Sequence, residues 1–271
     1  MYATLTEAAC AVLRTAPARE KASLSRKVAE AWWSGALAGI GGARPPDRPS
    51  RPERPELLPP ARMPKRRSAG SETTRVALLH ALAHIELNAV DLAWDLIARF
   101  AGDDLPQAFF DDWVTVADEE GLHFLMLSDR LAELGAAYGD LPAHDGLWEA
   151  AAETAHDLMA RLAIVPMVLE ARGLDVTPAM IRRFDAAGDA VTADILRVVL
   201  RDEIGHVAVG KRWFDWLCER TRNDSRHMWR NLVEQHFRGA LKPPFNLDAR
   251  QKAGFPPDFL DGFRNEADAG S

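Results

Sequence analysis

The sequence has few of the residues that mark several common classes of fold and site. Its 271 residues include only two cysteines, Cys10 and Cys218, and no Cys-x-x-Cys pair. This excludes a framework of disulfide bonds and a thiolate-bound iron site, and it favours a reducing compartment, the cytoplasm. No segment approaches the run of about 18 apolar residues that a membrane-spanning helix requires, and the N-terminal MYATLTEAACAVLRTAP lacks the uninterrupted apolar segment of a signal peptide. We therefore expect a soluble protein that does not contact a membrane.

Positive charge is also in short supply, and no stretch alternates apolar and polar residues as a half-buried strand does. The 33 Lys and Arg residues against 40 Asp and Glu residues give a net charge of −7, which argues against a general nucleic-acid-binding protein. Hydrophobic residues make up 47% of the chain, enough for the core of one large domain. Their helical spacing predicts an all-α protein.

Composition divides the chain into parts. Residues 1–40 form an N-terminal helical segment with a break at Pro17. Residues 41–70 hold eight of the 17 prolines, and seven Arg and one Lys against three acids give them a charge of +5 (8 − 3). Such a stretch cannot be a packed helix and predicts a polyproline-like arm or linker. We favour an arm that wraps the domain surface, and the alternative is a basic contact with RNA or an acidic partner.

Four long helical stretches follow within residues 71–220. The first begins at Ser71, a capping residue, and ends at the breaker AGDDLP; the second covers about residues 107 to 138. The third runs through LWEAAAETAHDLMARLAIVPMVLEARG, with a kink at Pro166 and a restart at Thr177-Pro178, and the fourth covers about residues 189 to 219. These stretches predict a four-helix bundle, with residues 221–271 as a C-terminal extension that packs on it.

The pattern Glu-x-x-His occurs three times in these stretches. On a helix, an acid and an imidazole three positions apart differ by about 60° around the axis and by about 4.5 Å along it, so both can reach one point. One such pair is a weak signal, because most are solvated pairs on a helix face. The pairs are Glu120 with His123, Glu153 with His156, and Glu203 with His206.

Two of the pairs belong to an internal repeat in which a lone glutamate precedes Glu-x-x-His. Glu86 lies 34 residues before Glu120 (120 − 86), and Glu170 lies 33 residues before Glu203 (203 − 170). The midpoints of the two intervals fall in or beside predicted turns, so each antiparallel hairpin brings its acids to one level. The repeat predicts a dimetal site built from four carboxylates and two imidazoles. The predicted ligands are Glu86, Glu120, His123, Glu170, Glu203 and His206.

The charges of this ligand set suit two metal ions. Four carboxylates at −4 balance two divalent cations at +4. Oxygen ligands with two imidazoles suit iron, with manganese, a mixed Mn/Fe pair and zinc as the alternatives. Glu119 and Asp202 each precede a pair by one residue and are candidates to hydrogen-bond a liganding imidazole, with simple solvation as the alternative.

Other acids and histidines fit the site less well. On a continuous helix His156 would lie about 21 Å from Glu170, which excludes Glu153 and His156 from the ligand set. His84 points about 160° away from Glu86 around the helix, so it is interpreted as a packing residue, together with His80.

The order of the six ligands resembles the ferritin-like superfamily. The stretches HALAHIELNAVDLAWDL, RDEIGHVAVGKRWF and FRGALKPPFNLDARQKAGFPP resemble an uncharacterised bacterial branch of it, the DUF455 family, and the chain is more distantly similar to the tRNA-modifying di-iron hydroxylase (MiaE-like) group. The resemblance implies a ferritin-like four-helix bundle with a non-haem di-iron centre.

The expected function is an oxidoreductase that activates O2, a hydroxylase or monooxygenase. It would act on an organic substrate, small or RNA-linked, with a separate electron-donor protein. One alternative is an iron-handling, ferroxidase-like protein without an organic substrate, and another is a bundle in which metal only adds stability. A tyrosyl radical is not expected, because Tyr138 would lie about 22 Å from His123 along the predicted helix. The sequence predicts no catalytic residue beyond the metal centre, and neither the substrate nor the oligomeric state.

Overall fold

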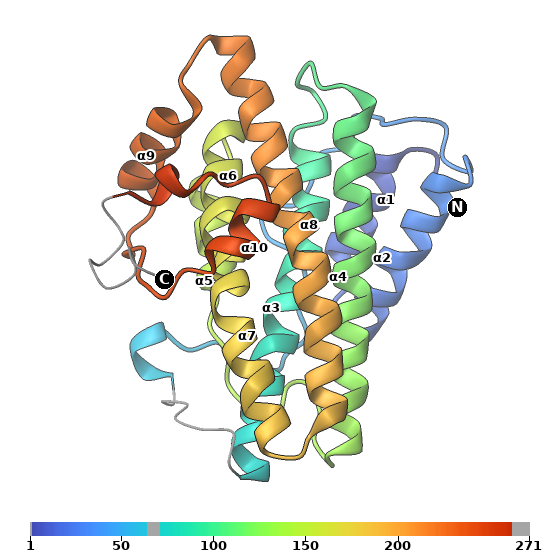
Figure 1. Ribbon diagram of the computed structural model, residues 1–271. Helices are drawn as coiled ribbons and strands as arrows, with labels where there is room; N and C mark the ends of the chain where they lie inside the picture. Colours follow the sequence, from blue (N-terminus) through green and yellow to red (C-terminus); the bar gives the residue numbers. More distant parts are fainter. Residues whose placement is uncertain (1, 64–70, 262–271) are drawn as a thin grey trace. The chain divides into compact units, whose positions relative to one another are not determined.

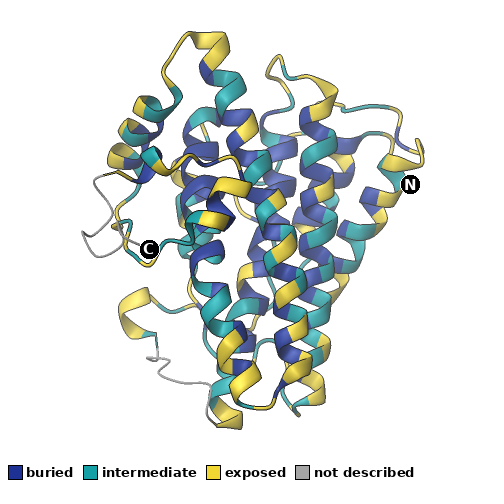
Figure 2. Cartoon of the chain, viewed as in Figure 1, coloured by how far each residue is buried: buried dark blue, intermediate teal, exposed yellow. Residues whose placement is uncertain are grey.

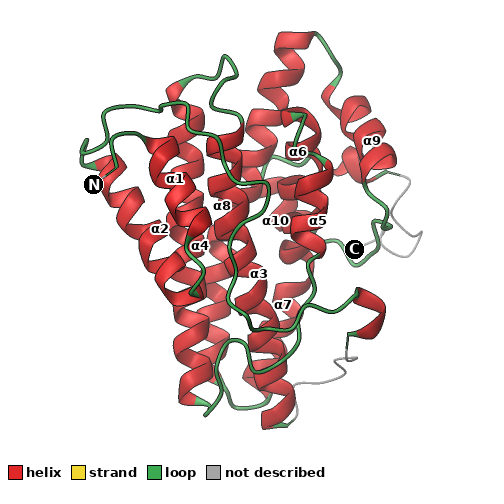
Figure 3. Ribbon diagram, turned by 180° about the vertical axis from the view of Figure 1, so that it is seen from behind, coloured by secondary structure: helices red, strands yellow, loops and turns green. Residues whose placement is uncertain are grey.

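The computed structural model describes residues 2–63 and 71–261. Within them the long regular elements are helices, which confirms the all-α class (Figure 1, Figure 3). Extended backbone pairs at an isolated bridge between Leu57 and Ala143. Backbone contacts group the chain into two compact units, Met1–Trp148 and Glu149–Ser271.

The first unit is built on the hairpin of α3 (Glu72–Arg99) and α4 (Gln107–Glu133). Ser71 caps α3 as predicted, since its side chain accepts a hydrogen bond from the backbone N–H of Thr74. Helix α2 (Ala18–Trp33) packs against α4, and α1 (Leu5–Arg14) packs against α3. The N-terminal helices, separated at Pro17 as expected, therefore share a core with the hairpin.

Helix α3 is the long apolar helix of this unit. Among the described residues it is the helix that is long and apolar enough to cross a membrane, but 67% of its most apolar window is buried. Buried positions run along much of its length (Figure 2). This is the pattern of a core helix, whose apolar residues face other helices.

A glycine lets α2 and α4 approach closely. A Cβ atom at Gly121 would lie 3.0 Å from the backbone oxygen of Ala22. In the same contact, Ser25 Oγ donates to the backbone oxygen of Ala117 over 2.7 Å, and Trp94 Nε1 donates to Ser25 Oγ over 2.7 Å. Because Gly121 follows Glu120 directly, this contact holds the helical turn that carries Glu120.

The described part of the proline-rich arm runs as an irregular loop against the first unit and includes the 3₁₀ turn η1 (Pro60–Arg62) (Figure 3). The backbone N–H of Ser50 donates to the oxygen of Leu13 over 2.8 Å, and that of Leu58 donates to Ala143 over 2.8 Å. The described part of the arm thus lies on the unit, in agreement with the interpretation that it wraps the surface. Residues 64–70 of the predicted arm lie outside the described residues.

A buried ion cluster joins α2, α3 and the arm. Lys21 Nζ lies 2.5 Å from Asp91 Oδ1, and Arg51 Nε lies 3.0 Å from Asp91 Oδ2. The side chains of Lys21 and Asp91 are fully buried. Burial lowers the pKa of Lys21 and raises the pKa of Asp91, so each charged form depends on the other charge nearby.

Helix α4 ends at Glu133, earlier than the predicted end near residue 138. Gly135 stops it, because its φ of +71° lies in the left-handed region that glycine adopts without strain. Tyr138 therefore lies in a loop and not on the helix. The predicted separation of about 22 Å between Tyr138 and His123, which assumed that both lie on one helix, is therefore wrong.

The second unit is built on the hairpin of α7 (Ala171–Ala186) and α8 (Ala190–Thr221). Helix α6 (Leu158–Ile164) and the π-helical segment η2 (Val165–Glu170) lead directly into α7. Helix α9 (Ser225–His236) packs against α6 and α8, and α10 (Leu247–Lys252) packs against α7 and α8. The last turn is η3 (Pro257–Leu260).

The third predicted helix is interrupted between Glu153 and Leu158. Helix α5 (Gly146–Glu153) stops, and α6 starts after Asp157, whose carboxylate accepts a hydrogen bond from the N–H of Ala160 over 3.1 Å. His156 lies in the turn between the two helices. The predicted distance of about 21 Å from His156 to Glu170 assumed a continuous helix and therefore does not apply. Glu153 pairs with Arg238 at 3.2 Å, as expected for a surface pair.

The two prolines of the third stretch both lie within helical backbone. Pro166 lies in the π-helical segment η2, and Pro178 lies inside α7, so the predicted restart at Thr177-Pro178 is wrong. Pro178 has no N–H to donate to the carbonyl of Leu174. The side-chain amide of Asn246 donates to that carbonyl over 3.1 Å, which explains how the helix continues.

Gly210 of α8 makes room for the ring of Pro166, and replacing it should weaken the fold. A Cβ atom at Gly210 would lie 2.4 Å from Pro166 Cβ. The ring is rigid, so Gly210→Ala is expected to lower the free energy of unfolding by about 1–3 kcal/mol. The matched control is Gly205→Ala on the same helix, where the new Cβ meets nothing within 4 Å. That variant should gain up to about 1 kcal/mol. Equal effects in urea denaturation would contradict the packing argument.

Candidate metal centre

Helix α4 carries its acid and its histidine on a buried stripe. Positions spaced alternately by three and four residues face one side of a helix. On α4 the buried positions of this stripe are Phe109, Trp113, Val116, Glu120, His123 and Leu127. Two polar groups in an otherwise apolar stripe require a partner that satisfies them.

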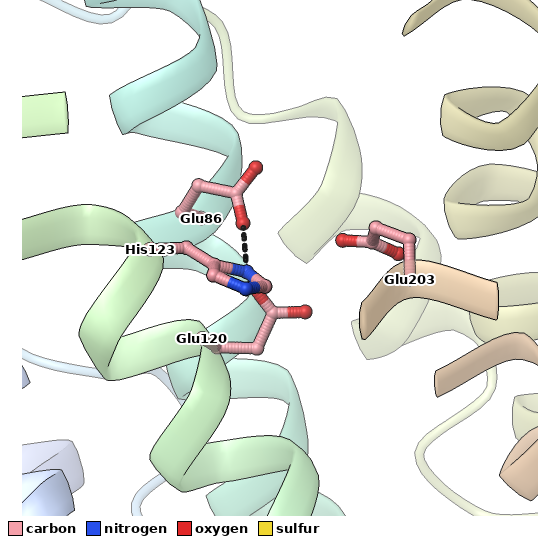
Figure 4. A group of neighbouring side chains, drawn as sticks. All are labelled: Glu86, Glu120, His123 and Glu203. Carbon is pink, nitrogen blue, oxygen red and sulfur yellow. Dashed lines mark hydrogen bonds and ion pairs between the residues drawn. The ribbon is translucent and has the colours of Figure 1, made fainter. Parts of the chain in front are cut away.

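The hairpin of α3 and α4 brings three of the predicted ligands together. His123 Nδ1 lies 3.2 Å from Glu86 Oε2 and 3.6 Å from Glu120 Oε2. All three side chains are at most 3% exposed. Figure 4 shows the side chains of Glu86 and Glu120 beside the imidazole ring. Nδ1 is therefore the histidine nitrogen that is directed at the carboxylates.

Burial and mutual repulsion disfavour the ionised forms of the two acids of this group. Burial, and secondly the charge of Glu120, raise the pKa of Glu86 well above its usual range, while the hydrogen bond with His123 acts in the opposite direction. Without a cation, Glu86 therefore tends to keep a proton at pH values at which an ordinary glutamate is ionised. A metal ion would replace that proton and stabilise both carboxylates, so binding would release protons.

Glu86, Glu120 and His123 are described residues of the first unit that each offer one ligand atom to a metal ion. Two carboxylates and one imidazole supply hard oxygen donors and a borderline nitrogen. This donor set suits a divalent metal ion such as iron, manganese or zinc.

The other three predicted ligands, Glu170, Glu203 and His206, lie in the second unit, on η2 and α8. His206 is buried on α8, with its Nδ1 3.8 Å from Glu203 Oε1. Glu170 is the last residue of η2, at the junction with α7. Their role as ligands stays a prediction.

The residues predicted to support the ligands have other contacts as well. Asp202 accepts hydrogen bonds from Arg201 over 2.7 and 3.1 Å. Glu119 is half-buried on α4 beside Glu120. Hydrogen bonding from either acid to a liganding imidazole stays a prediction.

His84, two residues before Glu86, is hydrogen-bonded to Tyr138. The sequence did not predict this contact. Burial, and secondly the charge of Arg51, lower the pKa of His84 to about 3, so the ring is neutral at pH 7. His84 Nε2 must donate to the backbone oxygen of His144, 3.0 Å away, because a carbonyl only accepts. Nδ1 therefore accepts from the Tyr138 hydroxyl over 2.8 Å. His84 is thus a hydrogen-bonded packing residue, as the sequence indicated.

Fold and site together define an all-helical protein with a buried group of acids and a histidine that could hold metal. The chain belongs to the DUF455 family, described as "Protein of unknown function (DUF455)", whose model matches residues 14–261. It is 43% identical over 210 residues to an uncharacterized protein of Haemophilus influenzae, covering 76% of this chain and 73% of that one. No solved structure matches the chain.

Proposed function

We propose that this protein is a non-haem dimetal oxidoreductase that activates O2, a hydroxylase or monooxygenase with two iron ions. In this proposal α3, α4, the helical run from α6 to α7, and α8 form a ferritin-like four-helix bundle. Its organic substrate is small or RNA-linked, and its electrons come from a separate donor protein in the cytoplasm. The observation that carries the proposal is the buried group of Glu86, Glu120 and His123, to which Glu203 of α8 would add a further carboxylate.

The chemistry of these side chains supports a metal centre. Glu86 faces an imidazole and a second carboxylate. A divalent cation would be attracted to both carboxylates and would stabilise their charged forms.

A second ion would use the remaining members of the repeat. Glu170 and His206 would raise the ligand set to four carboxylates and two imidazoles, which balance two divalent cations. Two metal ions supply the redox chemistry by which O2 is reduced. Insertion of one oxygen atom into a substrate C–H bond consumes two electrons and two protons in addition, with water as the second product, so an electron donor is required.

The residues around the ligands exclude water. Ala83 and Val90 on α3 and Val116, Ala117 and Phe124 on α4 are at most 2% exposed. Apolar walls beside the acids strengthen electrostatic interactions and protect reactive species from side reactions.

Oxygen uptake separates this proposal from an iron-handling function. Anaerobic protein loaded with about two Fe(II) per chain is mixed with O2 in the presence and absence of a reductant. The proposal predicts uptake that ceases after one turnover and resumes only when electrons and an organic compound are supplied, whereas a ferroxidase consumes O2 in proportion to each new addition of Fe(II). Continuous uptake driven by Fe(II) alone would contradict an organic substrate, and no uptake would leave a metal that only stabilises the fold.

A further inference from the structure

The segment from Lys242 to Arg250 forms hydrogen bonds with the first turns of α7. Arg172 Nη1 donates to the backbone oxygens of Lys242 and Pro244 over 2.8 and 3.0 Å. The backbone N–H of Asn246 donates to Asp175 Oδ1 over 2.9 Å. Arg172 and Asp175 lie in the first turns of α7, shortly after Glu170.

Asn246 replaces a hydrogen bond that the helix itself cannot make. The Leu174 carbonyl would normally accept from residue 178, but Pro178 has no N–H, and Asn246 Nδ2 donates to it over 3.1 Å. The same side chain caps α10, since its Oδ1 accepts from the N–H of Ala249 over 3.2 Å. The C-terminal segment thereby supports the second turn of α7 from outside the helix.

Arg250 holds the same part of α7 through a buried ion pair. Its Nε and Nη2 donate to the two oxygens of Asp175 over 2.9 and 2.7 Å, and Nη2 also donates to the backbone oxygen of Ala171 over 3.3 Å. The side chains of Arg250 and Asp175 are 2% and 0% exposed. Arg250 Nη1 is buried without a hydrogen-bond partner among the described residues.

We infer that Asn246 and Arg250 are positioning residues that fix the start of α7 and thereby the carboxylate of Glu170. This inference rests on the proposed function, in which Glu170 is a metal ligand. Glu170 ends the π-helical segment and Ala171 begins the α-helix, so a change in the first turns of α7 rotates or shifts Glu170. Groups that orient a ligand typically contribute 10–100-fold to metal affinity.

The test is a Mn(II) titration of the full-length protein, in which the EPR signal of free Mn(II) measures the unbound ion. Glu170→Gln serves as the reference for loss of that ligand. Asn246→Asp keeps the cap acceptor for Ala249 and removes the donor to Leu174. It should weaken one of the two ions at least about tenfold, as Glu170→Gln does. Adding Pro178→Ala supplies a backbone N–H for Leu174 and should restore the affinity.

Further variants separate positioning from general destabilisation. Arg250→Lys keeps the positive charge but cannot bind both oxygens of Asp175 and Ala171 together. It should weaken the same ion, without rescue by Pro178→Ala. Wild-type affinity in both Asn246→Asp and Arg250→Lys, or failure of Pro178→Ala to rescue Asn246→Asp, would overturn the inference. Unchanged binding in Glu170→Gln would also overturn it while leaving a metal site in place, whereas a wild-type protein that binds no Mn(II) would overturn the proposed function as well.

Discussion

Replacing Asp91 with alanine is expected to lower the free energy of unfolding by about 3–5 kcal/mol. The change leaves the ammonium group of Lys21 fully buried without its carboxylate partner, 2.5 Å away in the intact cluster. An isolated buried charge keeps its desolvation cost and loses the attraction that offsets it. The measurement is urea denaturation followed by circular dichroism.

Two controls identify the cause of that loss. Asp129→Ala breaks the Arg19–Asp129 ion pair between the same unit's helices α2 and α4, in which both side chains are 59% exposed, and it should cost no more than about 1 kcal/mol. Combining Asp91→Ala with Lys21→Met removes the stranded charge and should recover much of the stability. If Asp91→Ala and Asp129→Ala cost the same, the cluster does not support the first unit as described.

The sequence predicts well that Glu86, Glu120 and His123 come together. Helical periodicity places Glu120 and His123 on one face of α4. The short turn after α3 then places them at the same height along the hairpin as Glu86, so both placements depend on nearby residues only. Glu86 Oε2 and Glu120 Oε2 lie 3.2 and 3.6 Å from His123 Nδ1 as a result. The N-terminus of α3 follows from the capping residue Ser71 for the same reason.

Features that depend on distant residues could not be predicted in this way. Pro178 signals a helix start by every local rule, yet α7 runs through it because Asn246, distant in the sequence, supplies the missing hydrogen bond. The end of α4 was placed too late because a glycine within an apolar pattern does not reveal its own φ angle, +71° at Gly135. Lys21 and Asp91 resemble surface charges in the sequence, and only the packing of α2 and the arm on α3 buries them.

Removal of a ligand is expected to produce the largest functional change. Glu120→Ala deletes a buried carboxylate that faces His123, and Glu203→Ala deletes the acid of the Glu-x-x-His pair on α8 that the proposal makes a ligand. Each ion in the proposed centre depends on shared carboxylates, so either change should strip most of the bound metal. Glu153→Ala is the matched control, because Glu153 lies in the same Glu-x-x-His pattern but pairs with Arg238 at the surface.

The most direct test of the metal centre is therefore the metal content per chain, measured by elemental analysis of protein purified from iron-supplemented cells. The proposed centre predicts about two iron or manganese ions per wild-type chain and per Glu153→Ala chain. It predicts a marked loss in Glu120→Ala and Glu203→Ala, with circular dichroism showing that both remain helical. Wild-type protein without bound metal, and no difference between it and the two ligand variants after reconstitution with Fe(II), would contradict the dimetal centre.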